Sequence, residues 1–145
     1  MGLRLPQTFT DPASTDYCAE PDRMVPGHRV TLLEDGSETF PAMLAAIHGA
    51  RTRVHFETYI YVADETGRQF GDALLAAAGR GVEVGLLIDG VGTLGLSGSF
   101  LDELRAGGIE VIWFRPLRLR APWRRLFRPG HRKILVVDAA VGFVG

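Results

Sequence analysis

The chain has 145 residues, of which 46% are hydrophobic, and a formal net charge of -1 at pH 7. This is enough chain for one domain with a buried core. The single cysteine, Cys18, excludes an intramolecular disulfide and a cysteine-rich metal site. No apolar run approaches the roughly 18 residues of a membrane-spanning helix, and MGLRLPQTF lacks the apolar core of a secretory signal.

The N-terminal part of the chain divides into a leader and the start of a fold. Residues 1–26 hold four prolines and no sustained period of 2 or 3.6, so we predict an extended leader followed by a domain over 27–145. The β-rich segment Arg29–Leu33 is predicted to form a strand. Ser37 is the expected N-cap of a helix that continues through Ile47.

Strand-like and helix-like segments alternate in the middle of the chain. Strands are predicted at Val54–Val62, Val82–Ile88 and Ile109–Phe114, which are rich in β-branched and apolar residues. Helices are predicted at Thr66–Gly79 and Ser99–Ala106, where glycines mark the ends. Repeated strand and helix units with short glycine turns indicate an α/β domain whose sheet is covered on both faces.

Positive charge is concentrated near the C-terminal end of the sequence. Residues 1–113 carry 16 acidic side chains and 8 arginines, whereas residues 114–145 carry 7 arginines and one lysine against one acid. Arginines alternate there with apolar side chains in a predicted loop, which suits phospholipid headgroups or a nucleic-acid backbone; a solvated loop is the structural alternative. The residues expected to contact a membrane or another anion are Arg115, Arg118, Arg120, Trp123, Arg124, Arg125, Phe127 and Arg128.

Two further strands are predicted at Lys133–Val137 and Val141–Val144, and the first carries the candidate chemistry. Lys133 is the only lysine of the chain and follows His131 by two residues. Strand alternation would place both side chains on one face, with Asp138 at the strand end in a supporting role. An imidazole is a good nucleophile near pH 7, and a compact ammonium stabilises a phosphoryl group. The pair indicates phosphoryl transfer without a metal, although an acid for the leaving alkoxide is missing.

Two acidic residues are secondary candidates for the site. Glu57 shares a predicted strand face with His55 and Tyr59, and it either lines the site or is a hydrogen-bonded structural carboxylate. We expect His55 and Tyr59 to be core or rim residues. Asp89 ends a strand before a glycine-rich loop, a common position for sites in α/β folds. The glycine spacing in that loop does not match a dinucleotide fingerprint.

His131, Lys133 and Asp138 match the H-x-K-x4-D motif of the phospholipase D superfamily, and residues 27–145 resemble the N-terminal half of bacterial cardiolipin synthases. The segments that carry this resemblance include VHFETYIYVADETGRQFGDAL, GVEVGLLIDGVGTLG and FLDELRAGGIEVIWFRPL. The resemblance implies an α/β/α sandwich with a mixed, mostly parallel sheet, truncated here before the domain is complete. It implies no cofactor, and a reaction that joins two phosphatidylglycerol molecules through a phosphohistidine.

The resemblance also assigns roles to the motif. His131 would be the nucleophile and Lys133 would bind the phosphate, while a second motif, from the missing half of the chain or from another copy, would supply the general acid. The chain alone is therefore expected to be weak or inactive, and its expected place is cytoplasmic, peripheral on the inner (plasma) membrane. A phosphodiesterase or nuclease of the same superfamily is one alternative. A non-catalytic remnant that binds anionic membranes is another.

Overall fold

The computed structural model describes residues 27–90, 92–93, 95–114 and 131–145. Residues up to Leu32 form one unit and Leu33–Gly145 form a second. In the first unit, residues 28–32 have no regular secondary structure, and the side chains of Val30 and Leu32 are exposed. The predicted strand at 29–33 is therefore wrong, because β-propensity produces a strand only where a neighbouring strand pairs with it.

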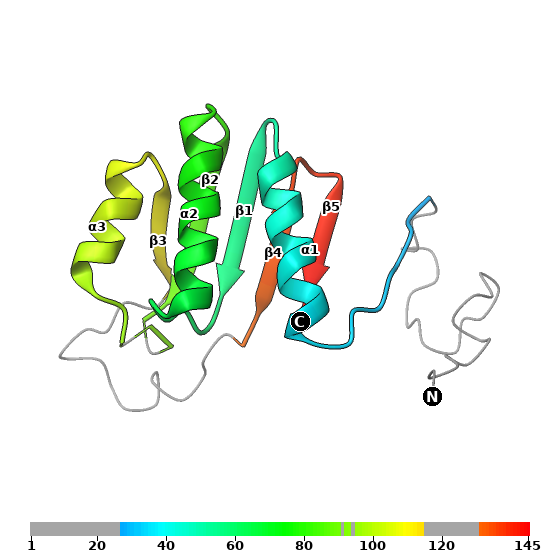
Figure 1. Ribbon diagram of the computed structural model, residues 1–145, viewed down its shortest axis with the longest axis horizontal. Coiled ribbons are helices and arrows are strands. Elements are labelled where there is room, and N and C mark those ends of the chain that lie inside the picture. The colour runs from blue at the N-terminus through cyan, green and yellow to red at the C-terminus, as the bar shows by residue number, and fades with distance from the viewer. Residues whose placement is uncertain (1–26, 91, 94, 115–130) are drawn as a thin grey trace. The chain divides into compact units, whose positions relative to one another are not determined.

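The second unit contains a five-stranded sheet with the order β3-β2-β1-β4-β5 (Figure 1). Three parallel neighbours form one side of it: β1 (Arg53–Thr58), β2 (Glu83–Asp89) and β3 (Glu110–Phe114). On the other side β4 (Lys133–Val137) runs antiparallel to β1, and β5 (Val141–Val144) runs antiparallel to β4. The sheet is thus mixed, and β4 alone among these strands runs in the opposite direction.

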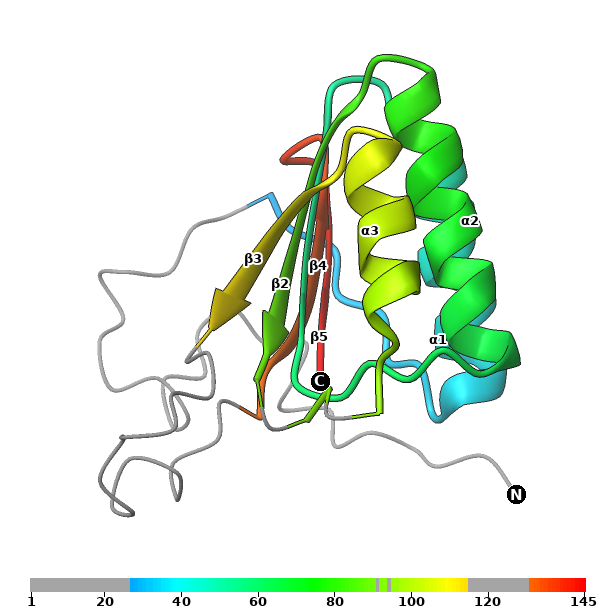
Figure 2. The ribbon, with the colours of Figure 1, turned by 90° about the vertical axis from the view of Figure 1, so that its left-hand side faces the viewer.

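The helices α1 (Gly36–Gly49), α2 (Glu65–Gly79) and α3 (Gly98–Ala106) lie on the same face of the sheet (Figure 2). The sequence pattern predicts helical cover on both faces. In the part of the chain that the structure describes, one helical layer of an α/β/α sandwich is present, and no helix covers the opposite face there. None of these three helices is long and apolar enough to span a bilayer.

Each helix begins at a polar side chain that caps its free N–H groups. Asp35, and not the predicted Ser37, caps α1, since its carboxylate accepts hydrogen bonds from the N–H of Ser37 at 2.8 Å and from its hydroxyl at 2.6 Å. Asp35 has extended backbone geometry, which lets a carboxylate face the first helical turn. Asp64 caps α2 and Ser97 caps α3 in the same way.

The core lies between the helices and the sheet. Side chains alternate along β1, with Val54 and Phe56 buried toward the helices and His55 exposed on the opposite face. The strand predicted to reach Val62 ends at Thr58, where the chain turns toward α2. The largest side chains with almost no exposure are Ile47, Val54, Leu74, Leu86, Ile88, Leu104 and Leu135.

Candidate active site

One edge of the sheet collects the carboxyl ends of β1 and β2, the first residue of β4 and the beginnings of the three helices (Figure 1). A strand and the helix after it are connected at the carboxyl end of the strand, where sites in α/β folds are usually found. Because β4 runs antiparallel to β1, its amino end reaches the same place, and Lys133 pairs with Thr58. We call this region the site edge.

His131 lies at the site edge, two residues before the first residue of β4, and its side chain is exposed. Its ring stacks on that of Tyr59, the first residue after β1, with ring centroids 4.4 Å apart and an angle of 17° between the planes. An offset stack of two aromatic rings is worth about 0.5–1.5 kcal/mol beyond the area it buries. The Tyr59 ring therefore holds the imidazole plane and leaves its edge, which carries the nitrogens, open to a substrate.

A glycine fixes the backbone on which Tyr59 is carried. A Cβ placed on Gly92 would lie 1.8 Å from the carbonyl oxygen of Tyr59, so only glycine allows the two segments to approach this closely. The loop that contains Gly92 is held by hydrogen bonds from the hydroxyl of Thr93 to the carbonyl of Asp89 at 2.5 Å and from the N–H of Gly92 to the Asp89 carboxylate at 3.4 Å. The loop after β2 thus supports the residue that stacks on His131.

Lys133 begins β4 and has the same strand parity as Leu135 and Val137, which are buried against the helical layer. His131 lies outside β4, so a shared face for His131 and Lys133 stays a prediction. The Lys133 amino group donates a long hydrogen bond of 3.4 Å to the carbonyl of His131, and its side chain is exposed. The ammonium and the imidazole are therefore linked through two residues of backbone and lie at the same edge.

Asp138 lies at the other end of β4. The strand has five residues, so this carboxylate is about 16 Å along the strand from Lys133. It accepts hydrogen bonds from the backbone N–H groups of Arg51, Thr52 and Arg53 at 2.8–2.9 Å, and from the Thr52 hydroxyl at 2.8 Å. These bonds hold the pKa of Asp138 well below its usual value. The geometry matches the supporting role expected for it and separates it from His131.

The two acidic residues chosen as site-lining candidates lie in different places. Glu57 is half-buried within β1, on the face opposite to that of Lys133, and pairs with Leu87 and Ile134 on the neighbouring strands. Asp89 lies at the site edge but is buried, where it stabilises its own glycine loop. Asp89 therefore ends its strand at the site edge, whereas Glu57 is one residue from the end of β1 and has its side chain on the face opposite to that of Lys133.

The predicted anion-contacting residues of the arginine-rich segment lie outside the described residues.

Sequence reasoning also missed two features that the structure shows. Tyr59 was expected to be a core or rim residue, although its place directly after a strand that ends at the site edge was a usable signal. The contact of Gly92 with Tyr59 had no sequence signal, since it depends on how two loops pack.

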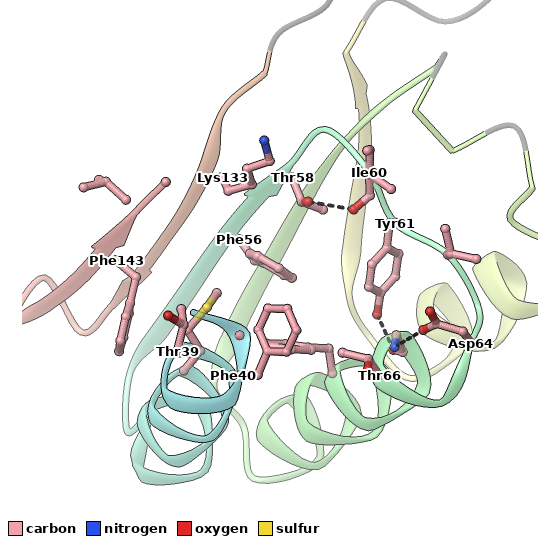
Figure 3. A pocket seen from close by; sticks show the side chains of 17 residues that line it. Thr39, Phe40, Phe56, Thr58, Ile60, Tyr61, Asp64, Thr66, Lys133 and Phe143 are labelled. Atoms are coloured by element: carbon pink, nitrogen blue, oxygen red, sulfur yellow. Dashed lines mark hydrogen bonds between the residues drawn. The ribbon is translucent and has the colours of Figure 1, made fainter. Parts of the chain in front are cut away.

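A cavity of about 490 Å³ opens beside Lys133, between α1, α2 and the sheet (Figure 3). Aromatic side chains from four elements form much of its wall: Phe40 of α1, Phe56 of β1, Phe70 of α2 and Phe143 of β5. Lys133 is the lysine on this wall, and Figure 3 shows its amino group pointing away from the Phe56 and Phe40 rings. The site edge therefore combines a nucleophile, a cation and an apolar hollow.

Comparisons with known proteins agree with this arrangement. Residues 43–145 match the family described as "Cardiolipin synthase, PLD-like domain". The chain is 42% identical over 120 residues to cardiolipin synthase B of Escherichia coli (strain K12), an alignment that covers 82% of this chain and 29% of that protein. It is also 42% identical over 114 residues to the cardiolipin synthase of Alkalihalophilus pseudofirmus, covering 79% of this chain and 23% of that one.

Two solved structures share the fold. The phospholipase D family member Nuc from Salmonella typhimurium superposes with a TM-score of 0.54 at 25% identity, covering 72% of this chain and 60% of that one. NucT from Helicobacter pylori gives a TM-score of 0.55 at 19% identity, over 72% of this chain and 63% of that one, and shows the fold alone. The chain belongs to the phospholipase D superfamily and, within it, to the cardiolipin synthase family. It spans less than a third of the length of these curated relatives.

Proposed function

We propose that this chain carries one half of the active site of a cardiolipin synthase-like phosphatidyltransferase, which acts on phosphatidylglycerol through a phosphohistidine at His131. The observation that carries the proposal is the arrangement at the site edge. The exposed imidazole is stacked on Tyr59, and the Lys133 ammonium is bonded to the carbonyl of the same histidine. A family that makes cardiolipin supplies the substrate class.

The first step forms a bond between an imidazole nitrogen of His131 and the phosphorus of the donor. The bond from phosphorus to the oxygen of the terminal glycerol breaks, and the leaving alkoxide takes a proton from a general acid and departs as glycerol. Lys133 binds the phosphoryl oxygens, where negative charge grows in the transition state. In the second step a hydroxyl of another phosphatidylglycerol attacks the phosphorus and gives its proton to the group that acted as the general acid and is now a base. The P–N bond breaks, His131 is regenerated, and cardiolipin forms.

The general acid is the histidine of a second H-x-K-x4-D motif, from another part of a longer polypeptide or from another copy. The other histidines of the second unit do not suit the role. His48 lies in the last turn of α1, and His55 lies within β1 on the face opposite to α1, α2 and α3. Alone, the 145-residue chain is accordingly inactive or weakly active. We propose a peripheral location on the cytoplasmic side of the inner membrane, and the lipid substrate supports contact with a bilayer.

The experiment measures phosphatidyl transfer in a protein that contains this sequence together with the second motif. Phosphatidylglycerol should be converted to cardiolipin and glycerol. His131→Ala should lower the rate of transfer by a factor of about a thousand or more, the scale expected for loss of a nucleophile. His48→Ala is the matched control, since that exposed side chain lies in the last turn of α1 and takes no part in the site. Undiminished transfer in His131→Ala would disprove the role of this residue.

A phosphodiesterase or nuclease is the second candidate, favoured by the fold shared with Nuc at 25% identity. The same nucleophile and cation would then transfer the phosphoryl group to water instead of a lipid hydroxyl. Binding and cleavage of DNA that weaken steeply with salt would support this candidate. Absence of both at low salt, with lipid transfer intact, would exclude it. The alternative of a non-catalytic membrane-binding remnant depends on the arginine-rich segment, which lies outside the described residues.

A further inference from the structure

The wall of the cavity beside Lys133 is held in a fixed shape by contacts between aromatic rings. Phe70 stacks on Phe56 with centroids 5.5 Å apart, and Phe40 meets Phe70 edge-on at 5.7 Å. Phe56 also meets Tyr61 edge-on at 6.4 Å. The volume of about 490 Å³ lies within the range of roughly 300–1,000 Å³ that is usual for small-molecule sites. The hollow therefore has the size and rigidity of a binding site.

Three polar side chains on the wall, those of Thr58, Tyr61 and Asp64, form hydrogen bonds within the fold. The hydroxyl of Tyr61 donates to the carbonyl of Gly67 at 2.9 Å, and burial holds the pKa of Tyr61 above its usual value, so this group stays neutral. The hydroxyl of Thr58 donates to the carbonyl of Ile60 at 2.9 Å. The Asp64 carboxylate accepts the N–H of Gly67 at 2.8 Å as the cap of α2. The interior thus suits an apolar ligand.

The mouth of the cavity differs from its interior. Lys133 makes one long hydrogen bond of 3.4 Å within the described residues, which leaves ammonium protons for an anion. Three large apolar side chains that line the same cavity are exposed to solvent: Phe40 by 43%, Ile60 by 56% and Val62 by 45%. Exposed apolar side chains gathered around one hollow indicate a ligand or lipid contact.

From these observations we infer that the cavity binds the first part of one acyl chain of the phosphatidylglycerol donor while Lys133 binds its phosphate. A cation at the mouth of an apolar hollow is complementary to a molecule with an anionic group at one end of a hydrocarbon chain. The inference rests on the proposed function for the identity of that molecule. The cavity then acts as a specificity site, since it favours acylated phosphodiesters over nucleic acid and over free glycerophosphodiesters.

The test is a calorimetric titration of the 145-residue chain with each of two soluble probes. Dihexanoyl phosphatidylglycerol, kept below its micellar concentration, is compared with glycerophosphoglycerol, which has the same phosphodiester and no acyl chain. Each buried methylene strengthens binding about fourfold, so the lipid should bind about a hundredfold more tightly or better. Equal affinities for the two probes would overturn the inference.

A double variant at the rim, Ile60→Ser with Val62→Ser, locates the acyl site. Both side chains are largely exposed, so the fold should survive, which circular dichroism checks. The variant should bind the lipid at least about tenfold more weakly and glycerophosphoglycerol unchanged. Ile112→Ser is the matched control, because Ile112 is 45% exposed on β3 and does not line the cavity, and it should change neither affinity. Wild-type lipid affinity in the double variant would place the acyl chain elsewhere.

Two further variants separate this inference from the proposed function. Lys133→Gln should weaken the binding of both probes by a similar factor, since each probe carries the phosphodiester. His131→Ala should leave the binding of both probes intact while it abolishes phosphatidyl transfer. If transfer survived in His131→Ala, the proposed mechanism would be refuted, while tighter binding of the lipid than of glycerophosphoglycerol would still support the acyl site. If the two probes bound equally while transfer still required His131, the acyl site alone would be refuted.

Discussion

Replacing Gly92 by alanine introduces a methyl group into the segment that carries Tyr59. The new Cβ would lie 1.8 Å from the Tyr59 carbonyl oxygen, 2.7 Å from its carbonyl carbon and 3.2 Å from its ring. A normal contact needs more than 3 Å, so one of the two backbones must move by more than about 1 Å. Backbone atoms cannot rotate away as a flexible side chain does, and the displacement is passed to Tyr59.

The displacement has two calculable effects. Overpacking of this kind lowers the free energy of unfolding by about 1–3 kcal/mol. Because Tyr59 stacks on His131 at 4.4 Å, the imidazole loses its fixed plane as well, and a 1 Å misplacement of a catalytic group lowers a rate by about a hundredfold. We expect Gly92→Ala to lose about a hundredfold in the rate of phosphatidyl transfer while most of the fold is retained.

Denaturant unfolding measures the stability, and the transfer assay measures the rate. The carbon-bound protons of the His131 ring give a third measurement, because the Tyr59 ring shifts their NMR signals and this shift should shrink in Gly92→Ala. Gly95→Ala is the control, since its Cβ meets nothing within 4 Å in the same loop. Wild-type stability, rate and His131 signals in Gly92→Ala would refute the reasoning.

Further predictions concern the stack and the hairpin after β4. Tyr59→Phe should keep the rate within about twofold, whereas Tyr59→Leu should lower it about tenfold, and a transfer assay that ranks them equally would contradict the positioning role. The pKa of Asp138 is lowered in the folded state, so its contribution to stability is complete above about pH 4 and is lost as the pH falls below that. Asp138→Asn should therefore lower the thermal midpoint at pH 7 and flatten its decline below pH 4; an unchanged acid profile would argue against these hydrogen bonds. Ala139 has a positive φ of 54°, so Ala139→Gly should raise the free energy of unfolding by about 1 kcal/mol in denaturant titrations, whereas Ala140→Gly should not.

Most of the sheet and its helices follow from local patterns in the sequence. Periodicity and glycine stops place α2, α3 and the strands from β2 to β5 within one or two residues of their bounds. The predicted strand at 29–33 failed because β-branched residues favour a strand only when a sheet edge is available to pair with them. The cap of α1 was misplaced by two residues because Asp35 and Ser37 are both good capping residues, and only backbone geometry separates them.

The sequence predicts which residues form the site and how they are spaced, but not the contacts that they make in the fold. The spacing of His131 and Lys133 and the parity of Lys133 with Leu135 follow from the alternation of a strand. The separation of Asp138 from the site also follows from the strand length. The stack on Tyr59 could not be derived, because it depends on which strand neighbours β4, and that choice is made by tertiary packing. The cavity beside Lys133 has the same origin.

The central claim is that the imidazole of His131 becomes covalently bonded to the phosphatidyl group. The most direct measurement is mass spectrometry of peptides from the enzyme that contains both motifs, quenched during turnover of phosphatidylglycerol under conditions that preserve the P–N bond. The account predicts a phosphatidyl group on the peptide that contains His131, and its absence in His131→Ala. A phosphatidyl group on another residue, or turnover that proceeds with His131 replaced, would contradict it.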